Sequence, residues 1–423
     1  MMAMLFYNFV IFKEKTMKRS PVALMIVIDA MGLSTLEYLL GKYSGEVKFP
    51  NLSKMGLGDI VLPQFKGRFG KSDGKSFAKR IQQVSATADS LIGHREMMGV
   101  VDHRTYNLFP NGFDPKFLAE LEKRTGHKSF FNKMAGGVEA IEINYKHHEE
   151  TGELIAYASK CDPLVQFAMS EKVIPVPEQY RIVETAFALA REMGIPITRA
   201  IARPYIRTEA GEIVRTSNRH DAVLPIGQTT LVDILRDDCV WTIAVGKTSD
   251  LVNTTYHSKI KLNKEIYLDP EMDLRFAHPK RKDTNPFCIQ GTINALRESH
   301  NVYRPKGTFI FTNLVDTDSV YGHTRDVEGS LRSLEEIDRC LPKIQAEMAE
   351  GDLLIITADH GMEHRADYGY HSNEPVPFLA QVKGGDATLG GLKTGVKPGL
   401  TDMGNLVAQY FHEEEKYAAI IKK

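Results

Sequence analysis

The residues 357–361, Thr-Ala-Asp-His-Gly, directly follow the apolar run 353–356. This pattern predicts a buried strand that delivers Asp359 and His360 to its carboxyl end, where open α/β sheets bind their ligands. A carboxylate beside an imidazole, with His371 farther along the chain, is a donor set typical of a metal site.

Two further apolar runs end in the same kind of residue. The run 22–28 is followed by Asp29, and the run 308–315 leads into Asp316, Asp318 and His323. Carboxylates and imidazoles without a thiolate suit manganese, zinc or magnesium, and argue against a cysteine-rich structural zinc site. A single aspartate at a strand end is more often a helix cap, but three such ends together favour a metal site.

A candidate nucleophile lies in the small-residue turn 85–90. Ser90 directly precedes a short helical pattern, where a helix amino terminus or a metal ion could favour the alkoxide form of its hydroxyl. The alternative is that Ser90 simply caps this helix.

In this order, the four segments resemble those of the alkaline phosphatase superfamily, and most closely its phosphopentomutase branch, whose members interconvert ribose 1-phosphate and ribose 5-phosphate. The resemblance runs from Lys18 to about residue 412. Further matching motifs lie at residues 50–52, 109–113, 201–204, 215–221, 246–250 and 313–323.

The resemblance implies an α/β fold with an alkaline-phosphatase-like core sheet, helices on both of its faces, and a smaller inserted α/β cap domain. It also implies two divalent metal ions, with manganese favoured and zinc or magnesium open, and a sugar bisphosphate as primer. Ser90 would lie between the ions and carry a phosphoryl group, while Asp316 would orient a ligand. The implied metal ligands are Asp29, Asp359 and His360 for one ion and Asp318, His323 and His371 for the other, and the implied substrate residues are Arg203 and Lys247.

Several positions depart from the family pattern. Ser90 replaces the usual threonine and keeps the hydroxyl, whereas Ala88 replaces a lysine, Arg95 a tryptophan and Asn373 an arginine. The change in charge leaves the phosphosugar open, so a phosphohydrolase or a mutase acting on another phosphosugar is the alternative. A metal-stabilised binding protein is disfavoured, since it would have no use for a nucleophile.

Composition limits the remaining possibilities. The chain has 423 residues, of which 43% are hydrophobic and 25% charged, as in a globular protein of two domains. The net charge of -1 argues against a nucleic-acid partner, and the apolar run 5–12 is too short to cross a membrane. Four cysteines without paired spacing, Cys161, Cys239, Cys288 and Cys340, favour a reducing, cytoplasmic location, and the oligomeric state stays open.

The domain organisation is predicted to be discontinuous. Residues 17–101 and 226–423 would form the metal-binding core and residues 102–225 the cap, while 1–16 would be an extension or an upstream start without function. Within the cap we expect a helix at 181–193 and a strand at 198–202, and within 253–300 one helix near 292–298. Arg219, His220 and Asp221 could serve as a hinge or contact substrate.

Three other signals are interpreted conservatively. His147 and His148 belong to a charged run that favours a solvated loop over a metal cluster. His364 is excluded from the ligands because the Asp-His-Gly turn leaves a strand. The sequence Gly246-Lys247-Thr248 is not a nucleotide-binding loop, because Trp241 stands where that motif requires glycine.

Overall fold

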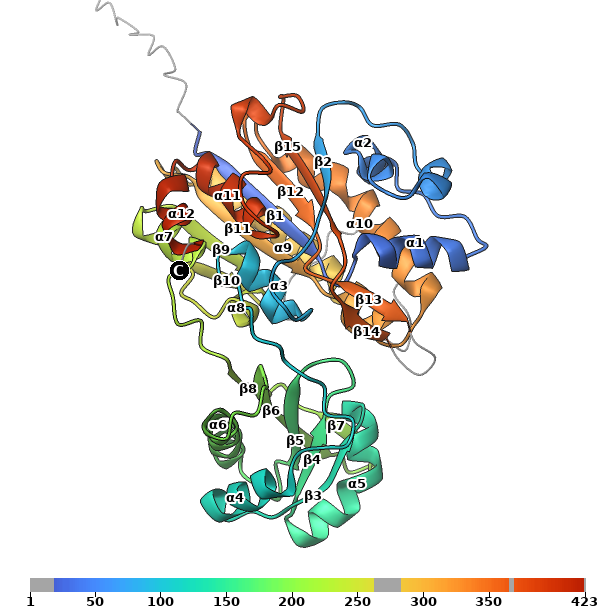
Figure 1. The fold of residues 1–423 in the computed structure, drawn as a ribbon, viewed down its shortest axis with the longest axis vertical. Coiled ribbons are helices and arrows are strands. Elements are labelled where there is room, and N and C mark those ends of the chain that lie inside the picture. Colours follow the sequence, from blue (N-terminus) through green and yellow to red (C-terminus); the bar gives the residue numbers. More distant parts are fainter. Residues whose placement is uncertain (1–18, 262–282, 365–368, 422–423) are drawn as a thin grey trace, which may run out of the picture.

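A computed structural model describes residues 19–261, 283–364 and 369–421. Its main sheet has seven strands in the order β10-β9-β11-β1-β12-β15-β2 (Figure 1). Their bounds are β10 (Ser258–Ile260), β9 (Trp241–Val245), β11 (Thr308–Leu314), β1 (Val22–Ile28), β12 (Leu353–Thr357), β15 (Val376–Val382) and β2 (Phe77–Ile81).

The centre of this sheet is parallel. Strand β1 runs parallel to both β11 and β12, while β15 is antiparallel to β12. Every residue of β1, β11 and β12 is buried, because helices cover both faces and leave no side for polar alternation. The register pairs Val27 with Thr357 and Ile28 with Leu314, so the carboxyl ends of the three strands lie together.

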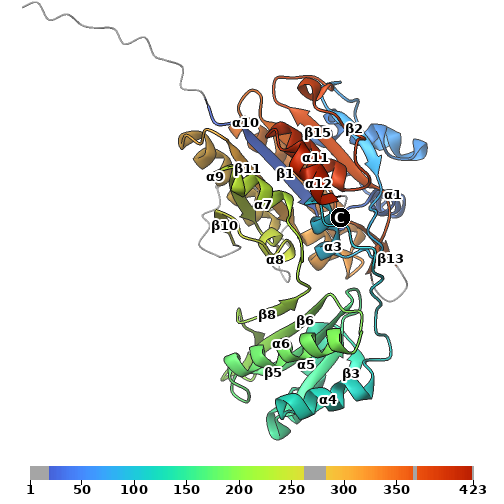
Figure 2. The same ribbon diagram turned by 60° about the vertical axis from the view of Figure 1, so that its left-hand side comes forward.

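Helices form layers on the two faces of the main sheet (Figures 1 and 2). One layer consists of α1 (Leu33–Lys42), α2 (Pro50–Lys54), α9 (Asn285–Asn301) and α10 (Val327–Glu347). The other consists of α3 (Ser90–Met97), α7 (Leu231–Asp237), α8 (Thr248–Leu251), α11 (Thr401–Tyr410) and α12 (Glu414–Ile421).

A second sheet, here called the cap together with its helices, lies beyond the carboxyl ends of β1, β11 and β12 (Figure 1). Its strands are β3 (Ser129–Met134), β4 (Leu154–Ala158), β5 (Leu164–Ser170), β6 (Arg199–Arg207), β7 (Ile213–Arg215) and β8 (His220–Val223). Its helices are α4 (Pro115–Thr125), α5 (Gly137–Thr151) and α6 (Val176–Glu192). The apolar cluster of the cap continues into the core through Leu91 and Ile92 of α3 and Leu251 of α8.

The predicted α/β class, with a main sheet and a second sheet inserted between β2 and β9, is confirmed. The helix expected at 181–193 is part of α6, and the strand expected at 198–202 is part of β6. Helix α9 begins at Asn285, well before the predicted start at 292, because its first turn is fixed by a distant carboxylate described below. The extension 1–16 lies outside the described residues.

The solvated loop predicted for His147 and His148 is wrong. Both residues belong to the last turns of α5, and His148 is fully buried. Its Nε2 accepts a hydrogen bond from the Ser170 amide at 2.9 Å, and its Nδ1 lies 2.7 Å from the Glu153 carbonyl oxygen. A buried imidazole with both nitrogens occupied by backbone groups has a structural role. No described helix is long and apolar enough to cross a membrane.

Candidate active site

The carboxyl ends of the three central strands bring together most of the predicted site. Asp29 follows β1, Asp359 and His360 follow β12, and a π-helical turn, η3 (Thr317–Gly322), begins soon after β11. Ala30 adopts a positive φ of 58° as the chain leaves β1, and its amide donates to Asp359 Oδ1 at 3.0 Å. This bond ties the ends of β1 and β12 to each other.

The first group of donors is Asp29, Asp359 and His360, whose ligand atoms lie within 4.8 Å of one another. All three residues are buried. His360 Nε2 is 3.5 Å from Asp29 Oδ1 and 3.6 Å from Asp359 Oδ2. His360 Nδ1 lies 2.9 Å from the Gly361 carbonyl oxygen, which turns Nε2 towards the carboxylates. Asp359 Oδ2 also lies 3.2 Å from His94 Nδ1, and a buried cluster of two carboxylates and an imidazole is a donor set that fits a cation.

The second group is Asp318, His323 and His371. Asp318 Oδ1 lies 3.2 Å from His323 Nε2 and 3.1 Å from His371 Nε2. The π-helical turn explains the spacing, because the His323 amide bonds to the Asp318 carbonyl at 3.1 Å and places both side chains on one side. The His360 and His371 rings, 4.0 Å apart between centroids, join the two groups.

Ser90 lies at the first group. Its Oγ donates to Asp29 Oδ1 at 3.1 Å and lies 3.1 Å from His360 Nε2. The cap of helix α3 is Asp89, which accepts from the Leu91 amide at 2.7 Å, so the capping alternative for Ser90 is wrong. Gly93 permits the close approach of α3, since a Cβ there would lie 2.4 Å from the Asp359 carbonyl oxygen.

The charges of the first group favour a bound cation. Burial and the neighbouring Asp359 raise the pKa of Asp29 well above its ordinary value. Burial alone would lower the pKa of His360, but the nearby carboxylates Asp359, Asp29 and Asp318 raise it to about 9. A proton is therefore held where a metal ion would place its charge, and binding of the ion would release that proton.

Two core residues near the site were not among the predicted ones. His94 Nδ1 lies 2.8 Å from the Ser90 carbonyl oxygen and 3.2 Å from Asp359 Oδ2. Asn313 of β11 donates to Asp29 Oδ2 at 2.9 Å. The helical spacing of His94 from Ser90 is a signal that could have identified it, whereas Asn313 stands in an apolar strand without such a signal.

The cap also sends residues to the site, from the loop 159–163 between β4 and β5. Cys161 Sγ lies 3.3 Å from His323 Nε2, and Asp162 Oδ1 lies 3.8 Å from His371 Nδ1. Arg199, the first residue of β6, bonds both Asp162 Oδ1 at 3.1 Å and Asp89 Oδ2 at 2.9 Å. These residues are far from the metal motifs in sequence, and only the docking of the cap brings them there.

The two predicted substrate residues lie apart from the donor groups. Arg203 is in β6 of the cap, where its Nε donates to Gln166 Oε1 at 2.8 Å, and burial lowers its pKa to about 10. Lys247 precedes α8 on the core, half-buried. Within the described residues neither forms a hydrogen bond or ion pair with the six predicted ligands. Of the hinge candidates, Arg219 pairs with Asp221 at 2.6 Å within the cap.

Asp316 does not orient a metal ligand as predicted. Its Oδ2 accepts from the amides of Thr284 and Asn285, both at 2.7 Å, and thereby fixes the start of α9. Burial raises the pKa of Asp316 to about 6. The orienting role expected for Asp316 is wrong because the first turn of α9 supplies the donors that occupy its carboxylate, whereas Asp318, which spacing favours as the ligand, does face His323 and His371.

The positions that depart from the family pattern surround the nucleophile. Arg95 is buried on α3, where its Nε donates to the Leu251 carbonyl at 3.1 Å and burial lowers its pKa to about 10. Asn373 accepts from Gln82 Nε2 at 2.6 Å and donates to the Ser85 carbonyl at 3.3 Å. Ala88 is half-buried in the turn before Ser90.

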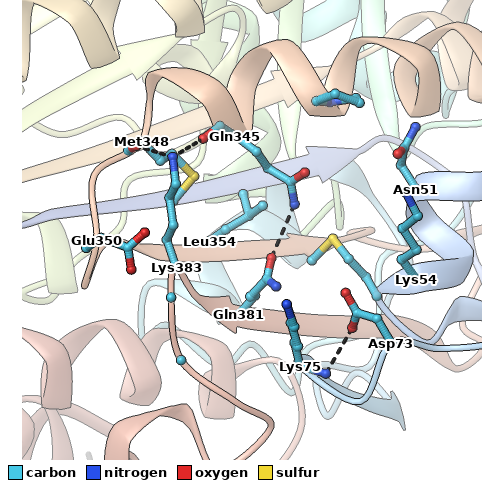
Figure 3. A pocket seen from close by; sticks show the side chains of 14 residues that line it. Asn51, Lys54, Asp73, Lys75, Gln345, Met348, Glu350, Leu354, Gln381 and Lys383 are labelled. Carbon is cyan, nitrogen blue, oxygen red and sulfur yellow. Dashed lines mark hydrogen bonds between the residues drawn. The ribbon is translucent and has the colours of Figure 1, made fainter.

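A surface hollow of about 500 Å³ lies elsewhere on the core (Figure 3). Its lining includes Asn51, Lys54, Lys75, Gln345 and Lys383, and Lys383 Nζ donates to the Gln345 carbonyl at 2.7 Å. It also touches Leu354, near the beginning of β12, whereas Asp359 follows the end of that strand. The hollow therefore does not belong to the donor groups.

Comparison with known proteins identifies the family. A model of the metalloenzyme superfamily matches residues 22–415. The phosphopentomutase of Pseudothermotoga lettingae is 35% identical over 373 residues, 87% of this chain and 86% of that protein. The phosphopentomutase of Clostridioides difficile is 33% identical over 390 residues, covering 90% and 89% of the two chains.

The chain belongs to the phosphopentomutase family. Among solved structures it is similar to a Leishmania mexicana phosphoglycerate mutase, with 11% identity, 94% and 96% of the two chains covered, and a TM-score of 0.42. The predicted phosphopentomutase resemblance is thus confirmed, as is membership of a metalloenzyme superfamily.

Proposed function

We propose that this chain interconverts the 1-phosphate and 5-phosphate of ribose or deoxyribose through a phosphoserine on Ser90. The observation that carries the proposal is the position of Ser90 Oγ, 3.1 Å from both Asp29 Oδ1 and His360 Nε2. A hydroxyl at a helix amino terminus and beside metal-type donors, in a chain of this family, supports the role of a phosphoryl acceptor.

The buried donors fit two divalent ions. Asp29, Asp359 and His360 would hold one. Asp318, His323 and His371 would hold the other, since Asp318 Oδ1 faces Nε2 of both histidines. Manganese is our first choice, because the combined set is dominated by carboxylates and imidazoles, with zinc or magnesium as alternatives. When bound, the ions would neutralise charge on the transferred phosphoryl group and favour the alkoxide form of the nucleophile.

The other residues have distinct tasks in this proposal. Phosphorylated Ser90 would pass its phosphoryl group to the free hydroxyl of a pentose monophosphate, and the resulting bisphosphate would turn over and return its other phosphoryl group. Arg203 would hold the distal phosphate through two parallel hydrogen bonds from its guanidinium. Lys247 would contact the same phosphate as a point charge. The cap would exclude water, to which the phosphoserine would otherwise be lost. A sugar bisphosphate would serve as primer.

A second candidate is a phosphohydrolase or a mutase for another phosphosugar. It is favoured by Asn373 and Ala88, neutral side chains next to the nucleophile turn where the family has cations. Loss of cations would weaken the hold on a sugar phosphate during transfer. A cytoplasmic location is also proposed, since the four cysteines are free thiols.

The test is an assay of ribose 5-phosphate and ribose 1-phosphate by phosphorus NMR, with manganese and a catalytic amount of sugar bisphosphate. We expect both isomers to reach equilibrium without accumulation of inorganic phosphate. Ser90→Ala should lower the rate by at least about a thousandfold while the fold and metal content remain, because a small hydroxyl contributes little to stability. Substantial activity in Ser90→Ala would exclude Ser90 as the nucleophile, and release of inorganic phosphate by the wild type would favour the hydrolase.

A further inference from the structure

The cap places a thiol at the second donor group. Cys161 lies in the loop 159–163 of the cap and is buried, yet its Sγ is 3.3 Å from Nε2 of His323, a residue of the core. The ligand atoms of Cys161, His323 and His371 all lie within 4.8 Å of one another. A sulfur donor from one domain therefore meets two imidazoles from the other.

Three of the separations among these donors and Asp318 are close to those of a tetrahedral metal site. Zinc binds nitrogen at about 2.0 Å and sulfur at about 2.3 Å, so tetrahedral ligands lie about 3.3–3.6 Å apart. The observed separations are 3.3 Å for Cys161 to His323, 3.2 Å for His323 to Asp318 and 3.1 Å for Asp318 to His371. One sulfur, two imidazoles and one carboxylate make a complete set of four.

An independent feature of His371 also points to a ligand. Its side chain is only 2% exposed, and within the described residues its Nδ1 has no hydrogen-bond partner. Nδ1 instead faces Asp162 Oδ1 at 3.8 Å, while Nε2 faces the donor cluster. Coordination through Nε2 would leave the ring proton on Nδ1, directed at the Asp162 carboxylate, as is common for histidine ligands.

The loop that carries Cys161 is held in place without a metal ion. Ser159 Oγ donates to Asp162 Oδ2 at 3.3 Å and accepts from the Cys161 amide at 3.4 Å. Asp162 is in turn paired with Arg199 at 3.1 Å. These bonds position the thiol at the core before any ion arrives, which lowers the entropic cost of coordination.

We propose that Cys161 is a cap-borne ligand of the second metal site, adding to Asp318, His323 and His371 a thiolate that is used when a thiophilic divalent ion such as zinc is bound in place of manganese, and that joins the cap to the core. The inference rests on the assignment of the last three residues as ligands in the proposed function. On binding, the ion replaces the thiol proton, which is released to solvent. Manganese prefers oxygen donors and leaves the thiol free, so the manganese form can open its cap and the zinc form stays closed.

The test uses cobalt as a spectroscopic probe of the full-length, metal-free protein. Wild type titrated with Co²⁺ should develop a sulfur-to-cobalt charge-transfer band in the near ultraviolet. Cys161→Ser should lose this band while binding the same amount of cobalt, whereas Cys340→Ser, which alters a buried thiol of α10, should keep it. The zinc affinity of Cys161→Ser should fall at least about tenfold, and its manganese affinity should stay unchanged.

The outcomes separate this inference from the proposed function. Cobalt bound to wild type without a sulfur band, or a band that persists in Cys161→Ser, would overturn the role of Cys161 and leave the other ligands untouched. Unchanged cobalt content in both Asp318→Asn and His323→Ala would instead overturn the metal-site assignment on which the inference rests.

Discussion

Replacing Arg199 with methionine should uncouple the cap from the nucleophile helix. Arg199 Nη2 lies 2.9 Å from Asp89 Oδ2 and 3.1 Å from Asp162 Oδ1. Asp89 caps the helix that begins with Ser90, and Asp162 neighbours Cys161 in the cap loop. One guanidinium thus connects the two parts of the molecule at the active site.

The magnitude follows from burial. The Arg199 side chain is 11% exposed, and those of Asp89 and Asp162 are 0% and 22% exposed. Removing one partner of a buried ion pair costs about 3–5 kcal/mol, because a charge is left without compensation. Asp89 keeps its bond to the Leu91 amide and Asp162 keeps some contact with water, so we expect the lower end, about 3 kcal/mol.

The assay is urea unfolding of Arg199→Met, Asp89→Asn and the double variant, followed by circular dichroism. The double variant should be less destabilised than the sum of the single variants, with a coupling free energy of about 1–3 kcal/mol. Arg124→Met is the matched control, because Arg124 is 35% exposed and pairs with Glu120 at 2.9 Å on the surface. Its removal should cost less than about 1 kcal/mol. Additive effects of Arg199→Met and Asp89→Asn would refute the coupling.

Three further predictions concern the site itself. His371→Ala should lower metal content and activity together, whereas His147→Ala, which alters a half-exposed ring of the cap, should change neither, as metal analysis would show; loss of metal in His147→Ala would count against the ligand assignment. Arg203→Ala or Lys247→Ala should lower kcat/KM, with a loss of transition-state stabilisation of about 2 kcal/mol or more, while the nucleophile still accepts phosphate from a small bisphosphate. Unchanged kinetics would place the distal phosphate elsewhere. Because the pKa of His360 is raised to about 9 in the metal-free site, metal affinity should rise between about pH 6 and 9, and calorimetry in two buffers should detect proton release, whose absence would contradict a protonated His360.

The sequence was sufficient to predict the parts of the site that follow strands. Asp29, Asp359 and His360 directly follow apolar runs, and parallel strands place their carboxyl ends at one edge, so local patterns determined which side chains would meet. Helix α3 was predicted together with an alternative role for Ser90. That alternative could be rejected only when Asp89 was seen to occupy the capping position.

The contributions of the cap could not be predicted in this way. Cys161, Asp162 and Arg199 reach the site through the docking of one domain on another, which depends on many weak contacts and leaves no periodic signal. For Asp316 and His148, by contrast, the sequence did suggest a role, and that role was wrong. Each was interpreted from its neighbours in sequence, while its partners come from α9 or from a separate strand.

The central claim, that Ser90 carries the phosphoryl group between two positions of a pentose, is tested most directly by a labelled chase. The protein is loaded with radioactive phosphate from a labelled sugar bisphosphate, washed, and mixed with unlabelled ribose 5-phosphate. We predict that label leaves Ser90 and appears in pentose phosphate, and that Ser90→Ala takes up none. Label that appears as inorganic phosphate, or that is absent from Ser90 in the wild type, would contradict the claim.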